Sequence, residues 1–100
     1  MKFGLTEQVY EMIRDALGWC EYVKKVYIFG SRARGDYREN SDIDLAVEFV
    51  GGDDSAAYLA RLMTQLDDLP LLYKFDVVDL RHVQDAEFLK NMSAEMVEFI

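Results

Sequence analysis

The chain has 100 residues, of which 51% are hydrophobic and 13% aromatic, and it carries 11 basic against 19 acidic side chains. This length is typical of one domain, so we expect a single domain over residues 1–100. The net charge of −8 argues against direct nucleic-acid binding, because such proteins usually carry an excess of basic residues. The acidic balance instead favours a cationic ligand, a metal ion or a basic protein partner.

Cysteine content and hydropathy bear on the compartment. A single cysteine, Cys20, excludes an internal disulfide and is typical of a reducing environment. The first residues contain no apolar run of the kind that signal peptides have. No segment approaches the roughly 20 apolar residues that a membrane-spanning helix needs. The sequence therefore predicts a cytoplasmic protein with no membrane partner.

The first half of the chain predicts one helix and two strands. Apolar residues recur at helical spacing over residues 6–17, and Thr6 is a good N-cap. Residues 25–29 contain Val-Tyr-Ile-Phe, which is β-branched and aromatic and predicts a strand. Residues 42–50 predict a second strand, because apolar and polar side chains alternate along it.

The second half predicts a helix, a strand and a helix. Leucines at helical spacing predict a helix over residues 55–69, which Pro70 ends. Residues 73–80 predict a third strand, and a last helix is expected to begin near Asp85, with an end near Phe99 that is frayed or extended. The order α-β-β-α-β-α predicts an α/β (α+β) fold with helices packed on a small mixed sheet.

Two carboxylates stand on one face of the second strand. Asp42 and Asp44 are one residue apart, so their side chains point to the same side. Aspartate is a poor strand former, and two like charges repel each other unless a cation lies between them. Paired hard oxygen donors suit Mg²⁺, although an isolated Asp-x-Asp is also common on a solvated strand.

A glycine-serine turn with two arginines ends the first strand. Gly30 permits a close backbone approach, and Ser31 offers a hydroxyl and an N–H group to an anion. Arg32 and Arg34 carry guanidinium groups that suit phosphate oxygens. Taken singly, these features favour a turn with solvated arginines, but together with the carboxylates they favour a site for a metal-bound triphosphate.

A third carboxylate is expected from the third strand, which contains Asp76 and Asp79. Asp76 lies near the start of that strand, as Asp42 and Asp44 lie near the start of theirs, so we expect Asp76 to complete the site. Asp79 lies deeper and is expected to be structural or exposed. For these acids to meet, the first two strands must be antiparallel and the last two parallel.

These residues resemble a known family. The segments "GSRARG", "SDIDLAV" and "DVVDL" are similar to the minimal nucleotidyltransferases of the DNA polymerase β-like superfamily, whose pattern is Gly-Ser, ten residues, Asp-x-Asp and a later Asp. The match covers nearly the whole chain and shows no departure within the motifs. The resemblance implies that Asp42, Asp44 and Asp76 hold two Mg²⁺ ions, and that Asp76 helps to deprotonate the acceptor.

The resemblance also implies a substrate and a reaction. Gly30 and Ser31 hold the β- and γ-phosphates of ATP, and Arg34, together with Arg32, neutralises phosphate charge. The acceptor hydroxyl attacks the α-phosphate, and pyrophosphate leaves. Positioning and charge stabilisation do most of this work.

Small members of the family are commonly paired with a HEPN-domain toxin, which implies an antitoxin that adenylylates a tyrosine of that partner. One alternative is adenylylation of a small molecule, as in aminoglycoside-modifying relatives, with a homodimer completing the site. The other is a non-catalytic antitoxin that binds its partner in a hetero-oligomer. The acidic composition is compatible with a basic, RNA-cleaving partner.

Overall fold

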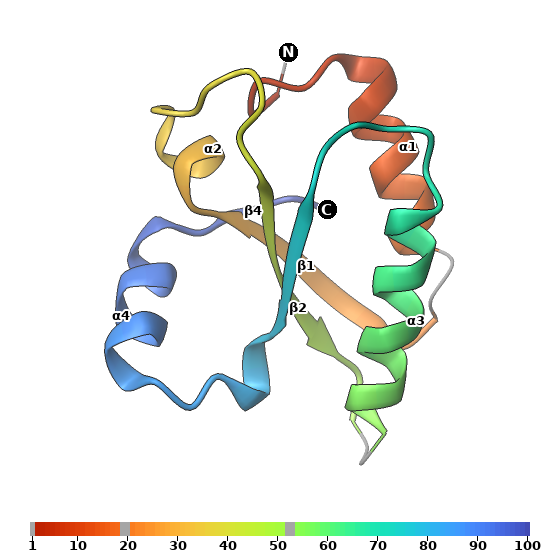
Figure 1. Cartoon of the computed structure of the whole chain (residues 1–100). Helices are drawn as coiled ribbons and strands as arrows, with labels where there is room; N and C mark the ends of the chain where they lie inside the picture. The colour runs from red at the N-terminus through yellow and green to blue at the C-terminus, as the bar shows by residue number, and fades with distance from the viewer. Residues whose placement is uncertain (1, 19–20, 52–53) are drawn as a thin grey trace.

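The structure is a computed structural model, and it describes residues 2–18, 21–51 and 54–100. Cys20 lies outside these residues. A central sheet separates two helical layers (Figure 1). The elements in chain order are α1 (Glu7–Gly18), β1 (Val23–Phe29), α2 (Ser31–Arg34), β2 (Ile43–Phe49), α3 (Ser55–Asp67), β3 (Phe75–Asp79), the 3-10 helix η1 (Leu80–His82), α4 (Ala86–Glu95) and β4 (Val97–Glu98).

The sheet is mixed, as the sequence predicts. Its strand order is β3-β2-β1-β4. Strands β1 and β2 are antiparallel, and β2 and β3 are parallel with α3 as the connection between them. Consequently the C-terminal end of β1 lies beside the N-terminal ends of β2 and β3. The motif residues of the three strands therefore lie close together at this end of the sheet.

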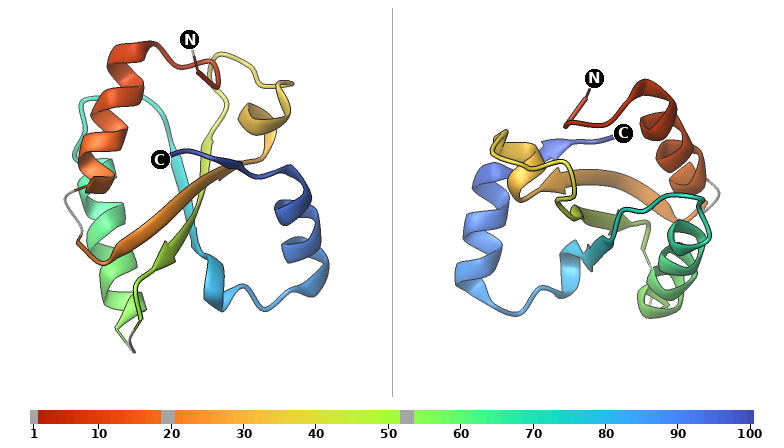
Figure 2. Two further views of the ribbon diagram at one scale, coloured as in Figure 1. Left: turned by 180° about the vertical axis from the view of Figure 1, so that it is seen from behind. Right: turned by 45° about the horizontal axis from the view of Figure 1, so that its top comes forward.

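The two faces of the sheet are covered unequally. Helices α1 and α3 pack on one face and α4 lies on the other, as the views from behind and above also show (Figure 2). The smaller cluster under α4 contains Phe29, Ala46 and Met92. The main core lies under α1 and α3 and includes Ile13, Leu17, Val26, Ile28, Ile43, Leu45, Val47, Phe49, Leu62, Leu66 and Val77.

Local signals account for the starts of α1 and α4. The Thr6 hydroxyl accepts a hydrogen bond from the Val9 N–H at the start of α1. The Asp85 carboxylate accepts hydrogen bonds from the N–H groups of Glu87 and Phe88, which caps α4 as predicted. No helix within the described ranges is long and apolar enough to cross a bilayer.

The C-terminal segment differs from the expected long helix. Helix α4 ends at Glu95, and Val97–Glu98 then pairs antiparallel with β1 as the edge strand β4. The Phe99 N–H donates to the Val26 carbonyl, and the Phe99 ring is buried in the main core. Burying this ring against β1 stabilises an extended chain where apolar spacing suggested more helix.

Candidate active site

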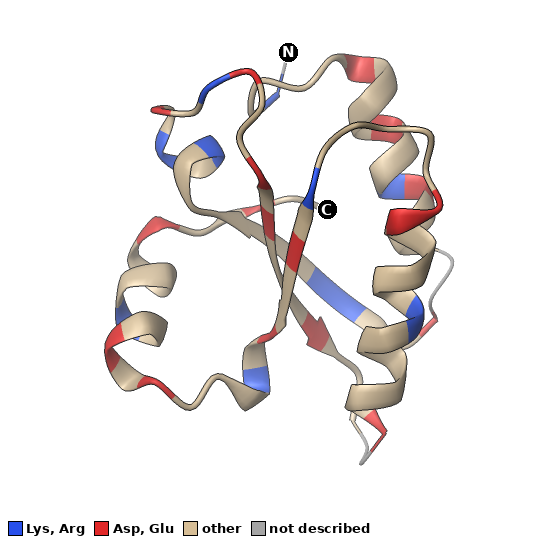
Figure 3. Cartoon of the chain, viewed as in Figure 1, with Lys and Arg blue, Asp and Glu red and all other residues tan. Residues whose placement is uncertain are grey.

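The carboxylates of Asp44 and Asp76 lie on neighbouring strands at the same level. In the parallel pairing of β2 with β3, Asp44 is in register with Asp76. Residues in register point to the same face of a sheet, here the face that α4 covers only in part. Acidic residues accordingly stand side by side on these two strands (Figure 3). The structure therefore brings together two of the three predicted acids.

Gly30 lies directly under the Asp44 carboxylate. A Cβ atom added to Gly30 would be 2.2 Å from Asp44 Oδ2, and the Gly30 φ angle is +75°. Both the contact and this backbone conformation require a residue without a side chain. The end of β1 and the start of β2 thus approach each other at a point where only glycine fits, next to the hydroxyl-bearing Ser31.

Asp42 lies one residue before β2 and is exposed. It is close enough for its charge to act on Asp44. Within the described residues, however, no three His, Cys, Asp or Glu side chains are arranged so that they could hold a metal ion. The ready-made arrangement is therefore the pair Asp44 and Asp76, with Asp42 beside it rather than in a closed cluster of three.

The environment of Asp44 disfavours its charged form. Partial burial, and then the charges of Asp76 and Asp42, raise the pKa of Asp44 from 3.8 to about 6. Arg34 and Arg32 act in the opposite direction, but they do not offset the burial and the two carboxylates. A cation bound beside Asp44 would relieve this repulsion.

This raised pKa predicts a pH-dependent stability. Between pH 3.8 and about 6 the folded state keeps a proton on Asp44 that the unfolded state releases, so the free energy of unfolding falls as pH rises through this range. After allowance for solvent screening of a half-buried group, we expect a loss of about 1–2 kcal/mol without divalent cations. Urea unfolding at several pH values measures it. Asp44→Asn should remove this part of the slope, and an unchanged slope would contradict the assignment.

Arg32 is placed differently from the expectation that it contacts phosphate. Its side chain is 2% exposed. Its guanidinium donates hydrogen bonds to backbone carbonyls of Phe3, Glu39 and Ser41. The side chain is thus committed to the loop that precedes β2, and we no longer propose it as a phosphate ligand. Sequence alone could not distinguish it from Arg34, because burial depends on contacts with distant segments.

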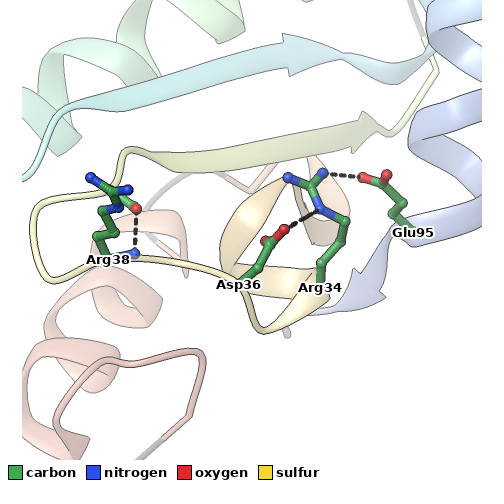
Figure 4. Close-up of polar contacts among 5 residues, drawn as sticks. Arg34, Asp36, Arg38 and Glu95 are labelled. Atoms are coloured by element: carbon green, nitrogen blue, oxygen red, sulfur yellow. Dashed lines mark hydrogen bonds and ion pairs between the residues drawn. The ribbon is translucent and has the colours of Figure 1, made fainter.

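Arg34 is the exposed arginine of this turn. Its Nη1 atom lies 2.9 Å from Glu95 Oε2, and its Nε atom lies 3.3 Å from an Asp36 carboxylate oxygen (Figure 4). Hydrogen bonds to Glu95 and then to Asp36 raise the pKa of Arg34. Arg34 therefore lies at the rim of the site, near enough to affect Asp44, with its guanidinium shared between two surface acids.

Asp79 belongs to the opposite face. It is buried, and its carboxylate accepts hydrogen bonds from the Arg81 N–H at 3.1 Å and from His82 Nδ1 at 2.9 Å. Burial alone would raise its pKa, but hydrogen bonds from His82, Ser55 and Arg81 together lower it. Asp79 is therefore a structural cap of η1, and Asp76 is the acid of β3 that faces Asp44.

A separate open cleft of about 820 Å³ lies between α1 and α3, on the sheet face opposite Asp44. Tyr22 and Tyr58 stack in its wall with ring centroids 4.0 Å apart. The cleft lacks the paired carboxylates and the glycine turn. We therefore place the candidate site where β1 ends and β2 and β3 begin, because the carboxylate pair and the glycine turn lie there.

The family comparison follows from the same segments. Residues 11–99 match the sequence family described as "Polymerase beta, Nucleotidyltransferase", which covers β1, β2, β3 and every motif residue. The chain belongs to this family. The nucleotidyltransferase fold expected from the sequence is thereby confirmed.

Relatives of this chain occur in Methanocaldococcus jannaschii. One is 41% identical over 69 residues and the other is 47% identical over 47 residues. Both are named as inferred protein adenylyltransferases. These matches cover 69% and 47% of this chain. The chain spans only 60% and 50% of the two relatives' own lengths.

Solved structures have the same fold. A toxin–antitoxin crystal structure with AMP-PNP contains a chain that is 25% identical, with a TM-score of 0.64; the match covers 91% of the chain described here and 72% of that chain. A protein described by inference as a minimal nucleotidyltransferase is 27% identical, with a TM-score of 0.60, and the match covers 97% and 95% of the two chains.

The carboxylate pair fits the Mg²⁺ ion that the nucleotidyltransferase family implies. Mg²⁺ takes one or two carboxylates and completes its coordination with water and substrate phosphates. Asp44 and Asp76 supply two such oxygen groups at one level of the sheet, and the pKa of Asp44 is raised by burial and then by the neighbouring carboxylates, whose charge a cation would neutralise. An arrangement with two ions would need Asp42 to join this pair.

Proposed function

We propose that this nucleotidyltransferase transfers AMP from ATP to a hydroxyl group in a Mg²⁺-dependent reaction. The observation that carries the proposal is the in-register pair Asp44 and Asp76, whose first member lies against the backbone of Gly30. This constellation joins a carboxylate pair to the glycine-serine turn at one edge of the sheet. Family membership, which extends over the same segments, supports it.

The proposed reaction is a displacement at the α-phosphorus of ATP. The acceptor oxygen forms a bond to this phosphorus, the bond to the bridging oxygen breaks, and pyrophosphate leaves with the electron pair. Bound Mg²⁺ would neutralise phosphate charge and lower the pKa of the acceptor hydroxyl. In this scheme Asp44 and Asp76 would hold the metal with Asp42 beside them, and Asp76, the exposed acid of the pair, would also accept the acceptor's proton.

The phosphate side of the site is proposed to consist of Gly30, Ser31 and Arg34. Gly30 lets the nucleotide approach the backbone closely. Arg34 can turn from Glu95 and Asp36 toward phosphate, because surface ion pairs contribute little and are exchanged easily. Triphosphate oxygens offer a guanidinium stronger, charge-assisted hydrogen bonds than these exposed carboxylates do.

The acceptor is proposed to be a tyrosine of a HEPN-domain toxin, which this chain would silence as its antitoxin. Three observations support a protein acceptor. The relatives are named as protein adenylyltransferases, one structural neighbour is a toxin–antitoxin complex with AMP-PNP, and the net charge of −8 suits a basic partner. The HEPN domain and the tyrosine come from the family resemblance.

Two alternatives remain distinguishable by experiment. A small-molecule nucleotidyltransferase would use the same carboxylates but would need a second chain to complete the acceptor side. A non-catalytic antitoxin would bind its partner equally well without ATP. The intact carboxylate pair and glycine turn favour a catalytic protein over the second alternative, a non-catalytic antitoxin that only covers its partner's surface.

The proposal predicts strict dependence on a divalent cation. With α-labelled ATP and the protein encoded beside this chain, we expect label on that protein in the presence of Mg²⁺ and at least a roughly 100-fold lower rate with excess EDTA, because the metal supplies several kcal/mol of charge stabilisation. Readdition of Mg²⁺ should restore the rate. Label on a small hydroxyl compound alone would favour the first alternative, and tight binding of the partner without any label would favour the second.

A further inference from the structure

The guanidinium of Arg32 connects the segments that carry the candidate site residues. It follows Ser31 in α2 and is 2% exposed. Nε and Nη2 both donate to the Ser41 carbonyl, at 3.1 and 3.0 Å, and Nη2 also donates to the Glu39 carbonyl at 3.2 Å. Because Ser41 directly precedes Asp42, this fork fixes the end of the loop from which the Asp-x-Asp pair starts.

The same guanidinium also lies against the segment that leads into β3. Its Cζ atom is 5.0 Å from the centroid of the Tyr73 ring, a cation–π distance. Immediately after Tyr73, the Lys74 carbonyl accepts a hydrogen bond of 2.9 Å from the Ile43 N–H. Arg32 therefore contacts the approaches to both strands that carry the in-register carboxylates.

A fourth segment completes the arrangement. Nη1 of Arg32 donates to the Phe3 carbonyl at 3.0 Å, and Tyr37 lies on the guanidinium with its centroid 5.3 Å from Cζ. The Tyr37 ring also lies against Gly4, where an added Cβ would be 2.2 Å from Tyr37 Cε2. The N-terminal residues thus pack against the loop that precedes β2, and these contacts leave no room for a side chain at position 4.

We propose that Arg32 is a positioning residue that sets the placement of Ser31, Asp42 and Asp76 relative to one another. The inference rests on the proposed function, because its effect is on the site for metal and nucleotide. A lysine cannot replace it, since one ammonium group lacks the planar fork that reaches several carbonyls at once. Arg32 touches no reacting atom in this role; it acts through the backbone of the loop.

The test compares Arg32→Lys with Ile13→Val, a variant on the buried face of α1 that is expected to lower stability without changing the loop. Four quantities are measured for each variant: the melting temperature, the dissociation constant for Mn²⁺·ATP, and the kcat and KM of AMP transfer. Supporting residues around a metal site typically change its affinity by roughly 10- to 100-fold, so we expect Arg32→Lys to raise the dissociation constant at least tenfold. We also expect its kcat to fall by about 100-fold from misplaced groups.

Ile13→Val should lower the melting temperature and leave Mn²⁺·ATP binding and kcat within about twofold of the original, since the cavity it makes lies across the sheet from the site. Tyr37→Leu removes one ring from the guanidinium but keeps its hydrogen bonds, and it carries the test if Arg32→Lys does not fold. It should weaken Mn²⁺·ATP binding several-fold. Suppose that the wild type binds Mn²⁺·ATP, and that a folded Arg32→Lys or Tyr37→Leu variant keeps the same binding and kcat. This result would overturn the positioning role alone. A wild type that binds no Mn²⁺·ATP would overturn the proposed function as well.

Discussion

Asp44→Asn is expected to lower the rate of AMP transfer by on the order of 10³-fold or more while the fold is retained. The substituted amide would keep the shape of the side chain but remove the charge that faces Asp76 across β2 and β3. Because the charged form of Asp44 is already disfavoured, with a pKa of about 6, the variant should also melt at a higher temperature at neutral pH. Transfer from α-labelled ATP and a thermal melt measure the two effects.

Glu48→Gln is the matched control. Glu48 lies on the same strand and the same face as Asp44 and is also partly buried, but it is in register with Lys25 rather than with an acid. Its loss should leave the transfer rate within about twofold, as is usual for surface changes away from a site. Equal rates for Asp44→Asn and the wild type would rule out the proposed role of the carboxylate pair.

Gly30→Ala has the second largest expected effect. Its Cβ would lie 2.2 Å from Asp44 Oδ2, so the carboxylate must move, and the backbone would hold alanine at a φ of +75°. We expect a loss of about 1–3 kcal/mol in the free energy of unfolding from the strained backbone. The displaced carboxylate should lower transfer by about 100-fold, because misplacement by about 1 Å can have that effect. Urea unfolding and the transfer assay test both parts.

Gly35→Ala separates strain from displacement. Gly35 ends α2 with a φ of +93°, but a Cβ there meets no atom within 4 Å. This variant should lose stability by about 1 kcal/mol and keep most of its transfer activity. If both glycine variants lose transfer to the same degree, the contact between Gly30 and Asp44 is not what matters.

The strand directions could be predicted from the sequence because the acids of the expected site have to lie close together. Requiring Asp42, Asp44 and a third acid to meet implied that β1 and β2 are antiparallel and that β2 and β3 are parallel, and both pairings are confirmed. The same reasoning chose Asp76 over Asp79. Burial of Asp79 against η1 agrees with that choice, because its carboxylate has hydrogen-bond partners of its own.

What the sequence could not reveal depends on contacts between distant residues. Strand β4 has only two residues, too few to show alternation, and it forms because β1 offers a free edge. The two arginines of "RAR" look alike in sequence, yet Arg32 is buried by Phe3 and Tyr73 while Arg34 pairs with Glu95, 61 positions away. The pairing of Asp44 with Asp76 was foreseen, whereas the exposed position of Asp42 beside the pair was not.

The most direct test of the account is paramagnetic broadening of amide NMR signals by Mn²⁺ in the presence of a non-hydrolysable ATP analogue. If Asp44 and Asp76 hold the nucleotide's metal above Gly30, the amide signals of these three residues and of Ser31 should broaden first as Mn²⁺ is added. Earlier broadening in the cleft between α1 and α3, around Thr64, would place the nucleotide on the other face of the sheet and contradict the account.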